Sequence, residues 1–292
     1  MADAAAQNPS RLRYRPWLTG SFLFIALLII VRFFLEILGT PHQLTQFLSS
    51  TGAVYLVAIY LGAVAPLRGV RRSWRIVLPG ILLAAWTQGW VILFTIISGA
   101  LRLQKSHFAE PEDWGNWGHL MHHVLDHLAE IVPVAIVVLV LMAAVLVLWR
   151  WPVTVGPGAV LGALVIIRFW SEAMNMAPVV SSAWSSTVAF LLCGLFLGGV
   201  GNLIGLSSCR KLLIPALVLG WAWRFWVFVA VLMAAAFPYM KTHYYAGAHP
   251  HPLIYLLRFL AVEVVLVGFI AGLIEWGIAA WMAGALRLRK LG

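Results

Sequence analysis

The chain alternates long apolar runs with short polar or basic segments along its whole length. Runs of about 20 apolar residues predict membrane-spanning helices, and eight runs qualify: 18–38, 50–67, 76–100, 129–149, 157–175, 184–205, 212–236 and 253–284. Soluble domains rarely contain one such run, so this pattern predicts an all-α integral membrane protein with eight transmembrane helices.

A polar motif occurs twice at a constant spacing. The sequence RFFLE at residues 32–36 returns as RFWSE at residues 168–172, and KSHF at residues 105–108 returns as KTHY at residues 241–244, both at an offset of 136 (168 minus 32, 241 minus 105). Apolar segments resemble one another by composition, but matched Arg, Glu, Lys and His at one offset rarely arise by chance. The chain is therefore predicted to be a tandem duplication of a four-helix unit.

The repeat predicts the domain organisation. We expect a basic N-terminal segment at 1–16, a first four-helix repeat at 17–150, a second at 151–286 and a basic tail at 287–292. Each repeat holds an even number of spans, so both copies face the same way. This predicts parallel repeats about an axis along the membrane normal.

Charge predicts the orientation of the chain. The sequence is 62% hydrophobic and only 10% charged, and its net charge of +10 comes from short Lys and Arg clusters between apolar runs. In the eight-span arrangement these clusters share one side of the bilayer: Arg11, Arg13, Arg15, Arg68, Arg71, Arg72, Arg75, Arg150, Arg210, Lys211, Arg287, Arg289 and Lys290. The positive-inside rule makes that side cytoplasmic, with both termini there. We expect a bacterial inner or plasma membrane, with lipid rather than nucleic acid as the partner, and a first span that is retained rather than cleaved as a signal peptide.

Two pairs of opposite charge lie near the ends of predicted spans. Arg32 and Glu36 are four residues apart, as are Arg168 and Glu172, so each pair shares one face of a helix. Either pair can neutralise itself or anchor to headgroups, or it can face the bundle interior and mark a binding site or pathway. Candidate cofactor-binding residues are these four together with Lys105 and Lys241, which otherwise serve as headgroup anchors.

The duplication also predicts clusters of acidic and histidine side chains. If the helices pack alike in each half, Glu36, His107 and Glu130 converge in the first unit. The matching residues of the second unit are Glu172, His243 and Glu263. Such clusters can bind a metal ion or an anionic group.

The segment before Glu130 is the richest in chemistry. If it is helical from about Trp117, the residues His119, His123, Asp126, His127 and Glu130 form one polar stripe. Histidines at i and i+4, such as His123 and His127, can share a metal ion, and a neighbouring carboxylate can orient the rings. The alternative is a solvated or interfacial face. Candidate metal ligands are His107, His119, His122, His123, Asp126, His127, Glu130, His243, His249, His251 and Glu263; of these, His249 and His251 alternate with prolines and are expected in an exposed loop.

Two known arrangements are similar to parts of this stripe. His119, His122 and His123 have a spacing similar to the histidine boxes of membrane fatty-acid desaturases, but those boxes are separate and cytosolic, whereas here they overlap on the opposite face. The segment from His123 to His127 resembles the inverted zincin motif, with Asp126 in place of Glu. Neither resemblance assigns the chain to a family.

Three functions remain open from the sequence. The first, which we favour, is a membrane subunit that binds a transition metal (Zn, Cu or Fe) or haem at a His/Glu-rich site on its extracytoplasmic face, within a larger complex or a homo-oligomer. The second is a transporter or channel with its pathway between the repeats, and the third is a structural or lipid-binding subunit. No Gly-rich phosphate loop, nucleophile elbow or paired-cysteine motif points to a particular reaction, so enzymatic activity is left open.

Overall fold

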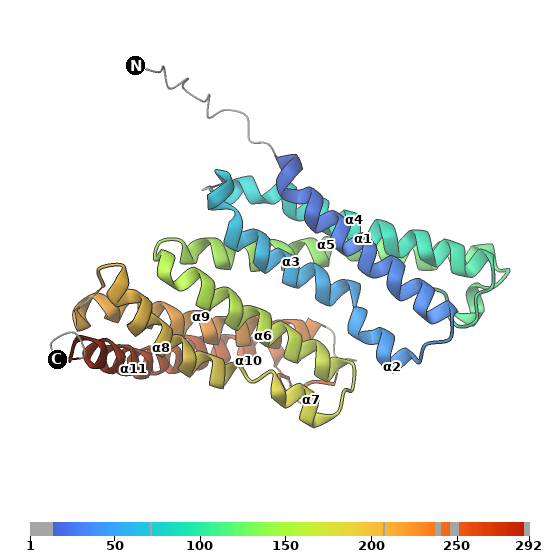
Figure 1. Cartoon of the computed structure of the whole chain (residues 1–292). Coiled ribbons are helices and arrows are strands. Elements are labelled where there is room, and N and C mark those ends of the chain that lie inside the picture. The colour runs from blue at the N-terminus through green and yellow to red at the C-terminus, as the bar shows by residue number, and fades with distance from the viewer. Residues whose placement is uncertain (1–13, 71, 207, 237–240, 246–250, 289–292) are drawn as a thin grey trace, which may run out of the picture. The chain divides into compact units, whose positions relative to one another are not determined.

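A computed structural model describes residues 14–70, 72–206, 208–236, 241–245 and 251–288 of the chain. These residues form helices joined by loops, and no strand occurs among them. The chain divides into two compact units, Met1–Leu146 and Val147–Gly292, which run from blue to green and from green to red in Figure 1. Each unit is described by itself below.

The first unit is built on four longer helices and several short turns. Its elements are α1 (Tyr14–Ile37), α2 (His42–Thr45), η1 (Gln46–Leu48), α3 (Ser50–Val64), η2 (Pro66–Arg68), η3 (Ser73–Ile76), α4 (Val77–Ala100), η4 (Pro111–Asp113) and α5 (Trp117–Leu148), which ends just past the unit boundary. The second unit contains η5 (Pro152–Thr154), α6 (Val155–Ala173), α7 (Pro178–Ala183), α8 (Ser186–Leu203), α9 (Cys209–Ala236), α10 (Pro252–Phe259), η6 (Leu260–Val267) and α11 (Gly268–Leu288).

The helices confirm an all-α fold suited to a bilayer. Within the described residues, seven helical segments are long and apolar enough to cross a membrane: Leu18–Ile37, Ser73–Ala100, Trp117–Leu148, Pro152–Ala173, Pro178–Leu203, Cys209–Ala236 and Pro252–Leu286. A helix suits this environment because it satisfies its own backbone hydrogen bonds where no water is present. The second expected span corresponds to α3, which has only 15 residues and is shorter than the ~20 residues that a spanning helix needs. The eight-span count therefore stays a prediction.

Helix α5 starts where the polar stripe predicted. It begins at Trp117 and runs for 32 residues, although the apolar run that marked this span starts only at residue 129. At 1.5 Å per residue its length is about 48 Å, which exceeds a hydrocarbon core of about 30 Å. The histidine-bearing turns therefore need not lie in hydrocarbon.

Close packing at matched glycines holds the last long helix of each unit in place. A Cβ atom on Gly62 of α3 would lie 2.7 Å from the backbone oxygen of Met142 on α5, and one on Gly198 of α8 would lie 2.4 Å from that of Ala279 on α11. Small residues allow helix backbones to approach in this way. Since the two glycines are 136 residues apart, the same close contact recurs in each unit.

The second unit has one irregular helical segment. Residues Leu260–Val267 form a π-helix between α10 and α11, a rare conformation that often occurs at functional sites. This segment carries Glu263.

Candidate functional site

The carboxylate of Glu36 is enclosed at the C-terminal end of α1, where its side chain is only 1% exposed. One oxygen accepts hydrogen bonds from Arg32 Nε at 3.1 Å and Thr45 Oγ1 at 3.0 Å. The other accepts from the backbone N–H of His107 at 3.1 Å and lies 2.5 Å from His107 Nδ1. The carboxylate therefore ties α1 to the loop that follows α4, and we call this cluster the first-unit clasp.

The second unit contains the matching cluster. Glu172 accepts from Arg168 Nε at 3.1 Å and from the backbone N–H of His243 at 3.0 Å, and it lies 2.5 Å from His243 Nδ1. In this second-unit clasp the hydroxyl of Ser181, at the position that matches Thr45, donates instead to the backbone oxygen of Pro178. The predicted contacts between Glu36 and His107 and between Glu172 and His243 are thus present.

The third predicted member of each cluster, Glu130 or Glu263, contacts a nitrogen group on a neighbouring helix. Glu130 lies 3.5 Å from Gln88 Nε2 of α4 and 2.9 Å from His127 Nδ1. Glu263 forms an ion pair with Arg224 of α9. Gln88 and Arg224 are 136 residues apart, so the same helix pair carries an amide in one unit and a guanidinium in the other. Sequence reasoning missed both residues, although a charge within the apolar run 212–236 was a visible signal.

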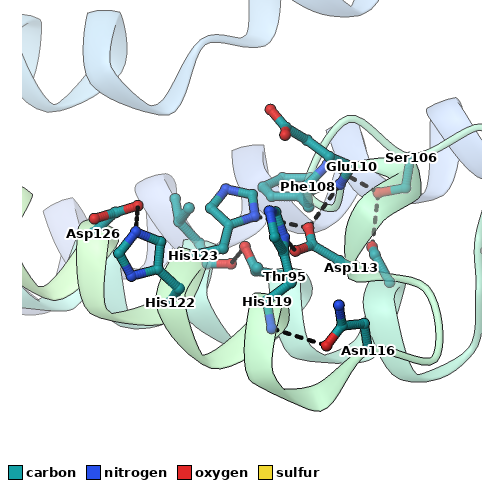
Figure 2. A network of polar contacts seen from close by, with 12 residues as sticks. Thr95, Ser106, Phe108, Glu110, Asp113, Asn116, His119, His122, His123 and Asp126 are labelled. Carbon is teal, nitrogen blue, oxygen red and sulfur yellow. Dashed lines mark hydrogen bonds and ion pairs between the residues drawn. The ribbon is translucent and has the colours of Figure 1, made fainter.

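Asp113, which sequence reasoning also missed, anchors the start of α5. Its carboxylate is fully enclosed and contacts His119 Nδ1 at 2.7 Å and His123 Nδ1 at 2.8 Å. It also accepts the backbone N–H of Glu110 at 2.8 Å. Figure 2 shows His119 and His123 turned toward this carboxylate from neighbouring turns of α5. The side chain of Asn116 caps the helix by accepting the N–H of His119 at 3.2 Å, a common role for Asn.

These contacts change the acidity of Asp113. Burial of the carboxylate acts to raise its pKa, but the hydrogen bonds from His119, His123 and the Glu110 amide outweigh burial and leave the pKa below its ordinary value. Asp113 is therefore ionised at neutral pH, and His119 and His123 each donate a hydrogen bond to it from Nδ1–H.

A ring contact and further hydrogen bonds extend this cluster along α5. The rings of His123 and His127 lie with their centroids 4.8 Å apart, His127 contacts Glu130, and Glu130 reaches Gln88, which is only 5% exposed. We call this series of residues the α5 polar chain: Asp113, His119, His123, His127, Glu130 and Gln88. It runs from the loop before α5 to a buried amide within α4.

The remaining predicted site residues lie apart from this chain. His122 and Asp126 face each other at 3.9 Å with side chains 75% and 63% exposed, and Figure 2 shows them away from Asp113. Lys105, Lys241 and His251 are exposed, and His251 immediately precedes α10. His249 lies outside the described residues.

The structure does not support the predicted metal centre. In the described part of the chain, no group of three or more His, Cys, Asp or Glu side chains is arranged to hold a metal ion. The histidines of the stripe instead direct Nδ1 at carboxylates. Asp126, also expected in this stripe, instead faces His122. The spacing could not show that a loop residue, Asp113, would contact two of the histidine rings.

The second unit lacks the α5 polar chain. The offset that pairs Glu130 with Glu263 is 133 (263 minus 130), and at this offset His119, His123 and His127 correspond to Pro252, Leu256 and Leu260. The two units therefore share the clasp and differ in the helix that follows it.

Comparison with known proteins adds no assignment to this geometry. No protein-family model, curated protein or solved structure matches the chain.

Proposed function

We propose that this chain is a proton-coupled membrane protein whose first unit binds and passes protons along the α5 polar chain. In this proposal the chain is a tandem duplication with eight spans and cytoplasmic termini, as charge and repeat parity predict. The clasps then hold the fold, and the α5 polar chain performs the function.

The observation that carries the proposal is the row of titratable side chains along α5. Asp113 contacts His119 and His123, His127 contacts Glu130, and the rings of His123 and His127 contact each other between these two groups. Histidine exchanges protons near neutral pH, and series of Asp, Glu and His form the proton relays of membrane pumps and transporters. His119, His123 and His127 each direct Nδ1 at a carboxylate, so Nε2 is the nitrogen left for proton exchange. Gln88 ends the series at a buried position.

The same ring orientation favours a second candidate function. Metal-ligating histidines commonly donate their other ring N–H to a carboxylate, and His123 and His127 are spaced i, i+4 on α5. A Zn, Cu or Fe ion, or haem iron, would take Nε2 of these rings, with its other ligands from solvent or a partner subunit. This is the form of the metal prediction that fits the observed contacts.

Adjacent histidines on α5 provide a matched test. Purified protein is reconstituted in liposomes that contain a pH-sensitive dye, and proton uptake is driven by a potassium diffusion potential. His123→Gln removes a member of the α5 polar chain, whereas His122→Gln alters an exposed neighbour. We expect His123→Gln to slow proton uptake by about a hundredfold, the lower end of what a positioned proton-transfer group contributes, while His122→Gln leaves it unchanged.

Each other outcome identifies a different function. Equal uptake by wild type and His123→Gln, or uptake no faster than that of empty liposomes, would contradict the relay. Stoichiometric metal or a haem absorption band in the wild type that is lost in His123→Gln would replace the relay by the metal function. A protein with neither property would leave the structural or lipid-binding role.

A further inference from the structure

The last helix, α11, contains a buried carboxylate that the proposed proton relay does not use. Glu275 lies in α11, within the candidate span Pro252–Leu286, and is 0% exposed. Neither of its carboxyl oxygens has a hydrogen-bond partner within the described residues. Every other glutamate discussed above contacts a nitrogen group, so Glu275 stands apart.

The surroundings of Glu275 are tightly packed. A Cβ atom on Gly194 of α8 would lie 3.1 Å from Glu275 Oε2, and one on Gly198 would lie 2.8 Å from the Met282 side chain. These glycines let α8 and α11 approach each other closely. A metal ion with its other ligands and waters does not fit where a single added carbon would already be in contact.

Few charged groups face this carboxylate. On α8 the titratable neighbour is the thiol of Cys193, which is close enough to interact electrostatically with Glu275. On α9, Arg224 is paired with Glu263, and Arg210 and Lys211 are exposed at the helix start. Neither Arg224, Arg210 nor Lys211 forms a hydrogen bond or ion pair with Glu275, so no cation in the described residues neutralises it.

We propose that Glu275 is a proton-binding site of the second unit, occupied by a proton when α8 and α11 are packed together. An ionised carboxylate without a partner costs far too much free energy in an apolar interior, so such a group takes up a proton instead. Its ionisation requires α8 and α11 to separate enough for water or a cation to reach it. The interface is therefore a two-state element that proton binding closes.

This site does not depend on the α5 polar chain. The first unit has an apolar residue at the matching place: Met142 by the offset of 133, or Val138 if Met142 is matched to Ala279 by their contacts with Gly62 and Gly198. Both residues are fully buried. Methionine is therefore a natural replacement for Glu275.

Infrared spectroscopy tests the protonation state directly. The spectrum of wild type at about pH 7 is compared with that of Glu275→Met, and a carbonyl band of a protonated carboxylic acid should be lost in the variant. Glu112→Gln, which alters an exposed glutamate, should retain the band. Absence of the band from wild type would overturn the proposal, as would its persistence in Glu275→Met.

Thermal stability provides a second readout. A proton-binding group in the folded state stabilises the fold at low pH and loses this contribution as pH rises. Between about pH 5 and about pH 9, the wild-type Tm should fall relative to Glu275→Met by at least about 2 °C. A constant difference in Tm would contradict the proposal. Failure of both Glu275→Met and Glu275→Gln to fold would also contradict it, since neutral side chains should be accepted.

Discussion

The two units of this protein use the same clasp and then diverge along the next helix. In each unit a glutamate lies four residues after an arginine and contacts a histidine 71 residues further along the chain. The contact involves both the backbone N–H and the ring Nδ1 of the histidine. Beyond the clasp, the first unit carries the α5 polar chain, and the second carries apolar residues, a π-helix and an Arg224–Glu263 ion pair. A feature present in both units accounts most simply for folding, whereas a feature confined to one is the better candidate for function.

The clasps also differ in burial. The side chain of Glu36 is 1% exposed, compared with 13% for Glu172, and only Glu36 accepts the additional hydroxyl of Thr45. A more buried charge costs more when its partner is removed. The first clasp should therefore be the stronger constraint.

Removal of the clasp carboxylates is expected to have the largest effect on stability. Glu36→Ala leaves Arg32 buried without its carboxylate and should lower the free energy of unfolding by about 3–5 kcal/mol. Glu172→Ala removes fewer and more exposed contacts and should cost about 2 kcal/mol. Unfolding of both variants in detergent micelles measures the difference. Equal losses, or a larger loss for Glu172→Ala, would contradict the proposed ranking.

Asp113→Asn should have a smaller effect that depends on pH. The variant loses charge-assisted bonds to two histidines, which should cost about 2 kcal/mol of stability at neutral pH. The folded-state pKa of Asp113 is lowered, so its contribution is present above the unfolded-state pKa and is lost as pH falls through the folded-state pKa. Asp113 also raises the pKa of His119, so protonation of that ring as the pH falls from neutral should first add to the wild-type advantage. The advantage should shrink only below about pH 4, where an unfolded-state aspartate takes up a proton. An advantage that keeps growing below this pH, when unfolding is measured from neutral to acidic pH, would contradict this assignment.

Conversion of the second unit toward the first should have the smallest effect. Arg224→Gln places an amide opposite Glu263, as Gln88 lies opposite Glu130. Polar contacts between membrane helices contribute about 0.6 kcal/mol on average, so the unfolding free energy should change by about 1 kcal/mol. The same unfolding assay measures it. A loss as large as that of Glu36→Ala would show that Arg224 has a role its counterpart lacks.

Much of this architecture could be predicted from the sequence. Apolar runs identified the long helices because each run must bury itself in lipid or protein. The pairing of Glu36 with His107 was expected only on the condition that the helices pack alike in each half, and the duplication itself stays a prediction from the constant offset. The start of α5 at Trp117 followed from the spacing of the polar stripe. These predictions depend on local pattern and on repetition.

The missed residues depend on packing that neither signal contains. Asp113 lies in a short acidic loop, where a carboxylate is ordinarily solvated, and only the fold of that loop encloses it. Gln88 is one polar residue in an apolar helix and becomes informative only when Glu130 lies beside it. Glu275 was a visible carboxylate in an apolar run, but its lack of a partner follows only from how α8 packs on α11.

The most direct test of the division between fold and function compares matched glutamates of the two units. Proton uptake by liposomes is measured for Glu130→Gln and Glu263→Gln, each normalised to the amount of folded protein. The relay predicts that Glu130→Gln loses most of its uptake, whereas Glu263→Gln retains the wild-type rate. Equal loss in both variants, or loss in Glu263→Gln alone, would contradict the assignment of function to the first unit.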